Sequence, residues 1–335
     1  MSYKVTIVIP IYNVEHFIER CLHSAFNQSF KSIEYLLIDD RGTDKSIEIA
    51  KSIIHSHARK QDIKLISHPH NQGLGATRNT GIANAKGEYV YFLDSDDAIS
   101  LNAIEKLYEV VVSKKIDVVV GSYTSVDYSN SNKKWEWRFD HKVIEGGFSV
   151  ANNYLTGGNY VMMWNKLYSL QFLKKNKIYC ISGTHEDNFY SLQVALNAQS
   201  LVTIPDVTYY YSLREGSIMN VIGEKNFLDY MDTFKLMINY SALYTQFSIY
   251  NKLLFFVYGQ RFSLLEKINN STHIALEKRE RLSKQIAAIC FLSFTEIWSL
   301  KTTSISHKIK FSMSLIPYKL QLSFLKVIKY LKRGK

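Results

Sequence analysis

The first 121 residues alternate short apolar runs with stretches of helical periodicity. Runs rich in β-branched and aromatic residues predict strands, and apolar positions three and four apart predict helices. The expected strands are Val5–Ile9, Tyr35–Asp39, Ile63–Ser67, Tyr89–Leu93 and Val118–Gly121, and the expected helices are Val14–Asn27, Asp44–His55, Leu74–Ala85 and Asn102–Lys114. This order predicts an α/β fold with a mostly parallel sheet flanked by helices. Because ligands bind beyond the carboxyl ends of such strands, the polar segments after strands one, two and four should converge.

The pattern changes after residue 121. Residues 122–215 contain paired glycines and stretches rich in Asn, Ser and Lys, which predict loops and hairpins over the ligand edge of the sheet. From about Gly223 the pattern is helical, and no segment is uniformly apolar over the roughly 18 residues that a membrane-spanning helix needs. We therefore expect one domain over residues 1–220 and a helical C-terminal region over residues 221–335.

Charge is concentrated at the C-terminal end. The formal net charge is +11, and residues 301–335 carry nine Lys or Arg and no Asp or Glu. No nucleic-acid-binding module accompanies these residues, so we expect no nucleic-acid partner. Three distant cysteines and the absence of an export signal at the first residues favour a cytoplasmic location without a disulfide framework or a zinc site.

The basic tail has helical amphipathicity. Leu320, Phe324, Val327, Ile328 and Leu331 share one face, and Lys319, Lys326, Lys329, Lys332 and Arg333 lie on the flanks and the opposite face. Such a helix either lies on an anionic membrane surface or docks on the preceding helices, and we expect peripheral attachment at the inner face of the cell membrane.

An acidic segment follows the fourth expected strand. Asp94, Ser95, Asp96 and Asp97 come directly after the apolar run Tyr89–Leu93. If the backbone stays extended, Asp94 and Asp96 point the same way, as two oxygen ligands of one Mg²⁺ or Mn²⁺ would. The alternative is a solvated acidic turn.

The first two expected strands also end in polar residues. Pro10 should end the first strand and place Tyr12 and Asn13 at its edge, where an aromatic ring can stack on a flat base. Asp39 and Asp40 end the second strand, where carboxylates can accept hydrogen bonds from a base or a ribose.

A glycine-containing segment, residues 71–81, precedes the third expected helix and carries Arg78. Arg78 can bind a ligand's phosphate directly or pair with the aspartates at the sheet end. The segment lacks the order and place of a dinucleotide fingerprint, which argues against a Rossmann oxidoreductase.

Two acidic residues, Glu186 and Asp187, begin an apolar-periodic stretch after His185. They either cap the helix or supply a general base that deprotonates an acceptor hydroxyl. The segment Tyr209–Ser217 is expected to follow an edge strand, and its Arg214 and Ser217 are weaker candidates for phosphate contacts. The roles of His185 and Lys166 stay open.

Taken together, these motifs resemble glycosyltransferase family 2, the inverting nucleotide-sugar transferases of the GT-A fold. The segments that carry the resemblance are Val5–Asn13, Asp39–Asp44, Asn71–Gly81, Phe92–Asp97, Trp164–Tyr168 and Glu186–Asp187. The resemblance implies that Pro10, Tyr12, Asp39 and Asp40 hold the base and that Asp94 and Ser95 meet the ribose and diphosphate. It further implies that Asp96 binds the metal, with Asp94 beside it, and that Asp187 is the catalytic base next to Glu186.

These observations predict a metal-dependent inverting glycosyltransferase. The expected donor is a UDP-sugar, and the expected acceptor is a glycan or lipid-linked oligosaccharide of surface-polysaccharide synthesis. The alternative is a non-catalytic glycan-binding protein at the membrane surface on a degenerate transferase scaffold.

Overall fold

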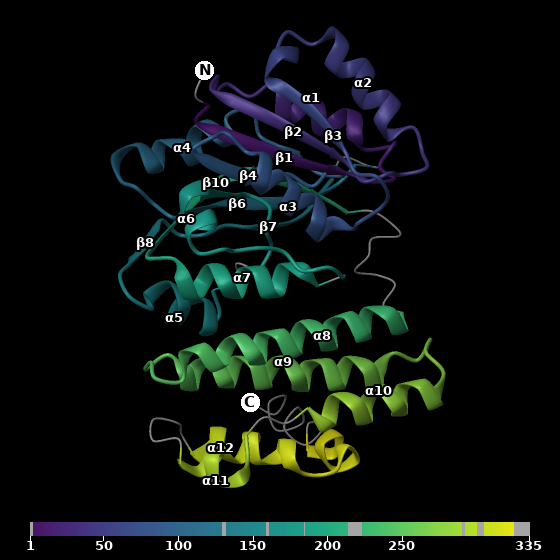
Figure 1. The fold of residues 1–335 in the computed structure, drawn as a ribbon, viewed down its shortest axis with the longest axis vertical. Coiled ribbons are helices and arrows are strands. Elements are labelled where there is room, and N and C mark those ends of the chain that lie inside the picture. The colour runs from purple at the N-terminus through teal and green to yellow at the C-terminus, as the bar shows by residue number, and fades with distance from the viewer. Residues whose placement is uncertain are drawn as a thin grey trace. The chain divides into compact units, whose positions relative to one another are not determined.

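The computed structural model describes residues 3–128, 132–158, 161–183, 185–213, 223–289, 292–299 and 305–324. The chain divides into two compact units, Met1–Ser217 and Ile218–Lys335 (Figure 1). Each unit is described by itself below.

The first four strands of the first unit form a parallel sheet in the order β3-β2-β1-β4. Their bounds are Val5–Ile11 for β1, Ile33–Asp39 for β2, Ile63–Ser67 for β3 and Tyr89–Phe92 for β4. Every residue of β1, β2 and β4 is buried, as the near-continuous apolar runs predict for strands covered on both faces. The predicted strands are therefore confirmed here, with shifts of one or two residues at their ends.

Beyond β4 the sheet becomes mixed. The order continues β4-β9-β6-β10-β5, with β9 antiparallel to both of its neighbours and β6 parallel to β10. The remaining strands are β5 (Ala98–Ile99), β6 (Val118–Asp127), β7 (Asn132–Trp137), β8 (Lys142–Glu145), β9 (Lys166–Ser169) and β10 (Ser200–Ser212). β7 extends the β6 edge as the expected hairpin, and β8 pairs with β10.

Two local predictions for residues 122–215 are wrong. The Trp164–Tyr168 segment was expected among loops and hairpins over the ligand edge, yet residues 166–168 enter the sheet as part of β9, whose antiparallel pairing needs no crossover helix. The strand before Tyr209–Ser217 was expected at an edge, yet β10 has β6 on one side and β5 and β8 on the other.

Helices cover both faces of the sheet. Side chains alternate between the two faces along each strand, and each face contributes to its own hydrophobic core. One core holds Val5, Ile7 and Ile9 together with residues of α1, α2 and α4; the other holds Val8 together with residues of α3, α5, α6 and α7. These helices are α1 (Ile18–Phe26), α2 (Ser46–Ser56), α3 (Leu74–Asn84), α4 (Ala103–Ser113), α5 (Ser149–Leu155), α6 (Leu170–Lys175) and α7 (Glu186–Asn197).

The described part of the second unit is helical, as predicted. Its helices are α8 (Glu224–Ser241), α9 (Tyr250–Asn270), α10 (Leu276–Ala288), α11 (Phe294–Ser299) and α12 (Ile305–Ser312), and short 3-10 turns occupy Ala242–Tyr244 and Met313–Leu315. Residues 318–324 begin the predicted tail helix, and its remainder lies outside the described residues. Across the described ranges, no helix has the length and apolar character needed to cross a bilayer.

Candidate active site

The loops after β1 and β2 pack directly on each other. The Asn13 side-chain oxygen accepts a hydrogen bond from the Thr43 N–H at 2.8 Å. A Cβ at Gly42 would lie 2.8 Å from the Asn13 nitrogen and 2.8 Å from its side-chain oxygen, so only glycine allows this approach. Tyr12 is 48% exposed beside this contact, which leaves its ring available for stacking.

Pro10 does not end β1, contrary to expectation. It pairs with Ile38, and the strand continues for one more residue. On the other side of β1, the pairing with β4 ends at Val8. Pro10 therefore has a paired neighbour on one side only, and a strand tolerates the missing N–H of proline at such a position.

Asp40 is buried, and protein groups occupy both of its carboxylate oxygens. Oδ1 lies 2.7 Å from His68 Nδ1 and accepts from the Gln72 N–H at 2.8 Å, and Oδ2 accepts from the Gly73 N–H at 2.8 Å. Asp40 thereby fixes the loop that enters α3. The neighbouring Asp39 is also buried and accepts from the Arg41 N–H and the Ser67 hydroxyl, each at 2.9 Å.

Arg78 joins the end of β4 to the start of α7. Its guanidinium is buried and donates to Asp94 Oδ1 and to Glu186 Oε1, each at 2.7 Å. These two carboxylates raise the pKa of Arg78 against the opposing effect of its burial, so the residue stays charged. Of the two roles open from the sequence, pairing with an aspartate at the sheet end is the one observed.

The acidic segment is a turn and not an extended strand. Asp97 N–H donates to the Asp94 carbonyl at 3.0 Å, so the alternation expected to align Asp94 with Asp96 does not apply. β4 ends at Phe92, and the backbone turns as its pairing ends. Ser95 is buried within this turn, and Asp96 is half-buried.

Asp97 anchors the turn to β10. Its carboxylate accepts from the Tyr209 hydroxyl at 2.6 Å and from the Ser212 N–H at 2.7 Å. Burial and the nearby charges of Asp96 and Asp94 raise the pKa of Asp97 well above its usual range. Arg20 adds a further link, since it donates to the Asp96 carbonyl at 2.7 Å and to the Ser212 hydroxyl at 2.8 Å.

Asp187 lies in the first turn of α7 in a desolvated environment. Burial and repulsion from Glu186 raise the pKa of Asp187 to about 7, against the attraction of Arg78 and Lys166. A carboxylate with this pKa can take up a proton near neutral pH, as a general base must.

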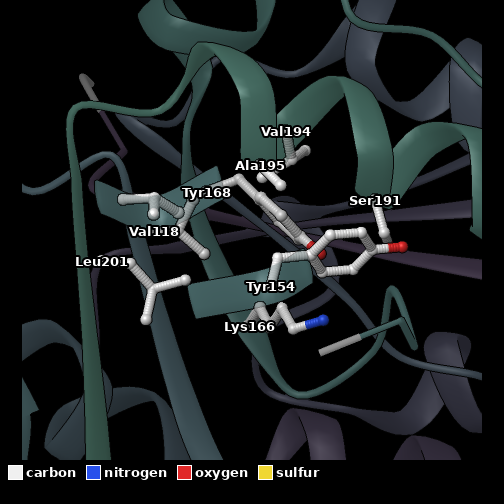
Figure 2. Close-up of a pocket in the computed structure, with 9 residues that line it drawn as sticks. Val118, Tyr154, Lys166, Tyr168, Ser191, Val194, Ala195 and Leu201 are labelled. Carbon is white, nitrogen blue, oxygen red and sulfur yellow. The ribbon is translucent and has the colours of Figure 1, made fainter. Parts of the chain in front are cut away.

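Lys166 projects from β9 into the protein interior below α7. Burial lowers the pKa of Lys166 to about 7, while Asp187 favours its charged form. Its amine donates to the Met162 carbonyl. Lys166 also lines a small cavity together with Tyr154, Tyr168 and Ser191 (Figure 2). The cavity has a volume of ≈ 20 Å³, which is enough for one water molecule. In the described part of the chain, none of the residues predicted to bind the donor lines this cavity.

The aspartates alone do not form a complete metal site. Within the described ranges, no three His, Cys, Asp or Glu side chains are placed to hold a metal ion together. Asp94 and Asp96 supply two carboxylates, and Mg²⁺ is commonly held by one or two carboxylates together with substrate phosphates. Asp94 and Asp96 thus offer oxygen donors of the kind taken by a metal ion that arrives with a diphosphate, and Asp94 Oδ1 is already paired with Arg78.

A family model for "Glycosyl transferase family 2" matches residues 6–182, more than half of the chain. The chain belongs to glycosyltransferase family 2. It is 32% identical over 229 residues to the glycosyltransferase GlyA of Streptococcus pneumoniae, covering 66% of this chain and 32% of GlyA. It is 30% identical over 240 residues to the poly(ribitol-phosphate) beta-glucosyltransferase of Bacillus spizizenii, covering 68% of this chain and 36% of that protein. The matched part thus spans about a third of the length of each relative.

Solved structures share the GT-A fold of this family 2 glycosyltransferase. S. aureus TarS 1-349 in complex with UDP-GlcNAc has a TM-score of 0.57 at 21% identity, covering 93% of this chain and 79% of that chain. The mannosyltransferase PcManGT from Pyrobaculum calidifontis in complex with GDP-Man and Mn²⁺ has a TM-score of 0.54 at 13% identity, covering 96% of this chain and 86% of that chain. At these identities the likeness concerns the fold, and it confirms the predicted fold class.

Three residues of this family 2 member were given no role from the sequence. His68, Arg20 and Asp97 support the loops around the predicted site, and each acts through contacts with residues distant in sequence. Only Asp97 had a sequence signal, as a third carboxylate in the motif. Arg214 and Ser217 lie outside the described residues.

Proposed function

We propose that this chain transfers one sugar, with inversion, from a nucleoside diphosphate donor to a hydroxyl group of a glycan or lipid-linked oligosaccharide. UDP is the proposed nucleotide. The observation that carries the proposal is the Arg78 bridge, because it ties the acidic turn proposed for the donor to the helix that bears the proposed base. Arg78 lies on α3, which begins at the loop that Asp40 fixes. This one helix therefore connects the end of β2, the acidic turn and the start of α7.

The donor side of the reaction would use the loops after β1, β2 and β4. The exposed Tyr12 ring would stack on the base, with Pro10 and Asn13 shaping its edge. Asp39 and Asp40 would act mainly by holding these loops in place, since their oxygens already accept hydrogen bonds from the protein. Asp94 and Ser95 would contact the ribose and diphosphate.

Asp96 and Asp94 would hold Mn²⁺ or Mg²⁺ together with the donor phosphates. The ion would offset the negative charge that develops on the departing diphosphate. Support for this choice comes from the donor set, two half-exposed carboxylates on one turn, and from the Mn²⁺ bound to a protein of the same fold.

Asp187 would accept the proton of the acceptor hydroxyl as that oxygen attacks the anomeric carbon. Glu186, fixed by Arg78, would hold the start of α7 in register with the acidic turn. Attack on the face opposite the leaving diphosphate would invert the anomeric configuration.

The acceptor is proposed to be a surface-polysaccharide intermediate at the inner face of the cell membrane. One relative is a poly(ribitol-phosphate) glucosyltransferase, and the basic amphipathic tail would hold this enzyme near a membrane-bound acceptor.

The donor site can be tested without knowing the sugar. UDP binding with Mn²⁺ is measured by calorimetry for the parent, Tyr12→Ala and the matched variant Tyr179→Ala, whose parent residue is 49% exposed. Loss of a base-stacking ring should weaken UDP binding by about 5- to 150-fold, since stacking on an aromatic ring contributes roughly 1–3 kcal/mol. Equal affinity of the two variants would remove Tyr12 from the site.

The metal and base assignments need separate variants. Asp96→Ala should abolish the enhancement of UDP binding by Mn²⁺, and Asp62→Ala, at a carboxylate outside the proposed site, should not. Asp187→Asn should retain UDP binding and lose sugar transfer from whichever nucleotide sugar stabilises the parent. Transfer by Asp187→Asn at the parental rate would assign the base to another residue, and a parent that binds UDP but transfers no sugar would favour the glycan-binding alternative.

A further inference from the structure

The outer faces of α11 and α12 in the second unit are apolar and exposed. Phe294 and Trp298 on α11 are 57% and 42% exposed, and Ile305 and Ile309 on α12 are 69% and 45% exposed. The inner faces of the same helices are already packed, because Ile297 and Phe311 are buried with Leu254, Tyr258 and Leu292. The exposed residues are therefore an additional apolar surface.

These residues lie on one continuous surface. The rings of Phe294 and Trp298 are 5.8 Å apart, and the Trp298 indole N–H donates to the Ser312 hydroxyl at 3.1 Å. Lys308 donates to the Trp298 carbonyl at 2.7 Å and lies 5.9 Å from the Trp298 ring centroid. Positions 305, 308, 309 and 312 have the spacing of a single helix face. We call Phe294, Trp298, Ile305, Lys308 and Ile309 the α11–α12 surface.

Lys308 is the charged residue of this surface, and the sequence that follows α11 is basic. No Asp or Glu occurs after Glu296, while residues 301–335 carry nine Lys or Arg. Glu296 itself accepts hydrogen bonds from the Ser293 N–H and hydroxyl, each at 2.7 Å, as a helix cap. Aromatic and aliphatic side chains flanked by lysine are typical of protein surfaces that enter the lipid headgroup region.

We propose that the α11–α12 surface binds the headgroup region of an anionic lipid bilayer, independently of the predicted tail helix. Insertion of the four apolar side chains would remove exposed hydrophobic area from water, and Lys308 would face lipid phosphates. The inference does not depend on the transfer reaction.

Co-sedimentation of the full chain with phosphatidylcholine vesicles containing phosphatidylglycerol tests the proposal. Ile305→Ser/Ile309→Ser should weaken binding about tenfold or more, given the transfer free energy of apolar side chains. The control, Leu243→Ser/Leu276→Ser, removes two leucines of the same unit that are 65% and 64% exposed and should leave binding unchanged. Circular dichroism confirms that both variants stay helical.

A second measurement locates the contact even if the isoleucine variant is destabilised. Vesicles that contain brominated phosphatidylcholine should quench tryptophan fluorescence in the parent, and Trp298→Phe should remove most of that quenching. Neutral vesicles should bind less protein than anionic ones, because zwitterionic headgroups give the membrane no negative surface potential to attract Lys308.

Three results would overturn the proposal. One is vesicle binding that does not depend on the α11–α12 surface: undiminished binding of Ile305→Ser/Ile309→Ser, or complete loss of binding when residues 325–335 alone are removed. A second is unchanged quenching in Trp298→Phe. The third is a concentration-dependent dimer in light scattering that the isoleucine changes dissociate, since the surface would then bind a second copy.

Discussion

Replacement of Arg78 by methionine tests how the candidate site is held together. The change removes a buried cation that donates 2.7 Å hydrogen bonds to Asp94 and to Glu186 and leaves both carboxylates in place. Breaking a buried ion pair in this way destabilises a protein by about 3–5 kcal/mol. Because the Asp94 side chain is 23% exposed and can recover some solvation, we expect the lower end of that range.

The second variant separates the loss of the bond from the charge left behind. Adding Glu186→Gln to Arg78→Met removes the more buried of the two carboxylate charges, whose side chain is only 8% exposed. We expect this double variant to recover about 1–2 kcal/mol of the loss, since an uncompensated buried group accounts for much of the effect. A double-mutant cycle with Glu186→Gln alone gives the coupling between the two residues.

Urea unfolding followed by tryptophan fluorescence measures these effects on the first unit. Trp298 is the one tryptophan of the sequence outside residues 1–217, so a Trp298→Phe background confines the signal to that unit. The restriction matters because two units need not unfold together. A loss of about 3 kcal/mol should lower the urea midpoint by roughly 1–2 M. A loss below about 0.5 kcal/mol, or no recovery in the double variant, would refute the assignment of the bridge as a structural link.

Three further changes probe packing, the acidic turn and the proposed base. Gly81→Ala would place a Cβ 2.3 Å from a Val8 methyl group and should lower the free energy of unfolding by about 1–3 kcal/mol, whereas Gly259→Ala, in open space within α9, should raise it by about 0.5–1 kcal/mol; urea unfolding checks both signs. Tyr209→Phe removes the hydroxyl that donates to buried Asp97 and should destabilise the first unit by about 1–3 kcal/mol in the same assay, and an unchanged midpoint would show that water replaces it. Since a base must be deprotonated, transfer should rise with pH through the Asp187 pKa of about 7, and a pH–rate profile that is flat from 5 to 9 would contradict the base role.

The sequence predicted β1 to β4 and α1 to α4 because these segments carry apolar runs or helical spacing, but it predicted neither the two-residue β5 nor the full length of β6. It did not predict β9, because a strand of only four residues, Lys166–Ser169, is too short to show an alternation that distinguishes it from a loop. The mixed half of the sheet likewise depends on pairing between distant segments, which local spacing does not encode.

For the candidate site, residue types were easier to predict than contacts. The segments that carry Asp40, Arg78, Asp94 and Glu186 were identified, but the partners of these side chains were not. Arg78 meets Asp94 and Glu186 across 16 and 108 residues of chain, and Asp40 meets His68 across 28. Such contacts follow from the packing of α3 and α7 on the sheet and have no signature along the chain.

The Asp40 carboxylate restricts mutation unequally in the loop that it holds. It takes hydrogen bonds from the main-chain N–H groups of Gln72 and Gly73, which every residue except proline can provide. Position 72 is exposed and is therefore free to vary, whereas Gly73 adopts φ +87°, a conformation that suits glycine. During evolution, we therefore expect substitutions at position 72 and few at positions 40 and 73, because the loop needs the Asp40 carboxylate and the positive φ of Gly73.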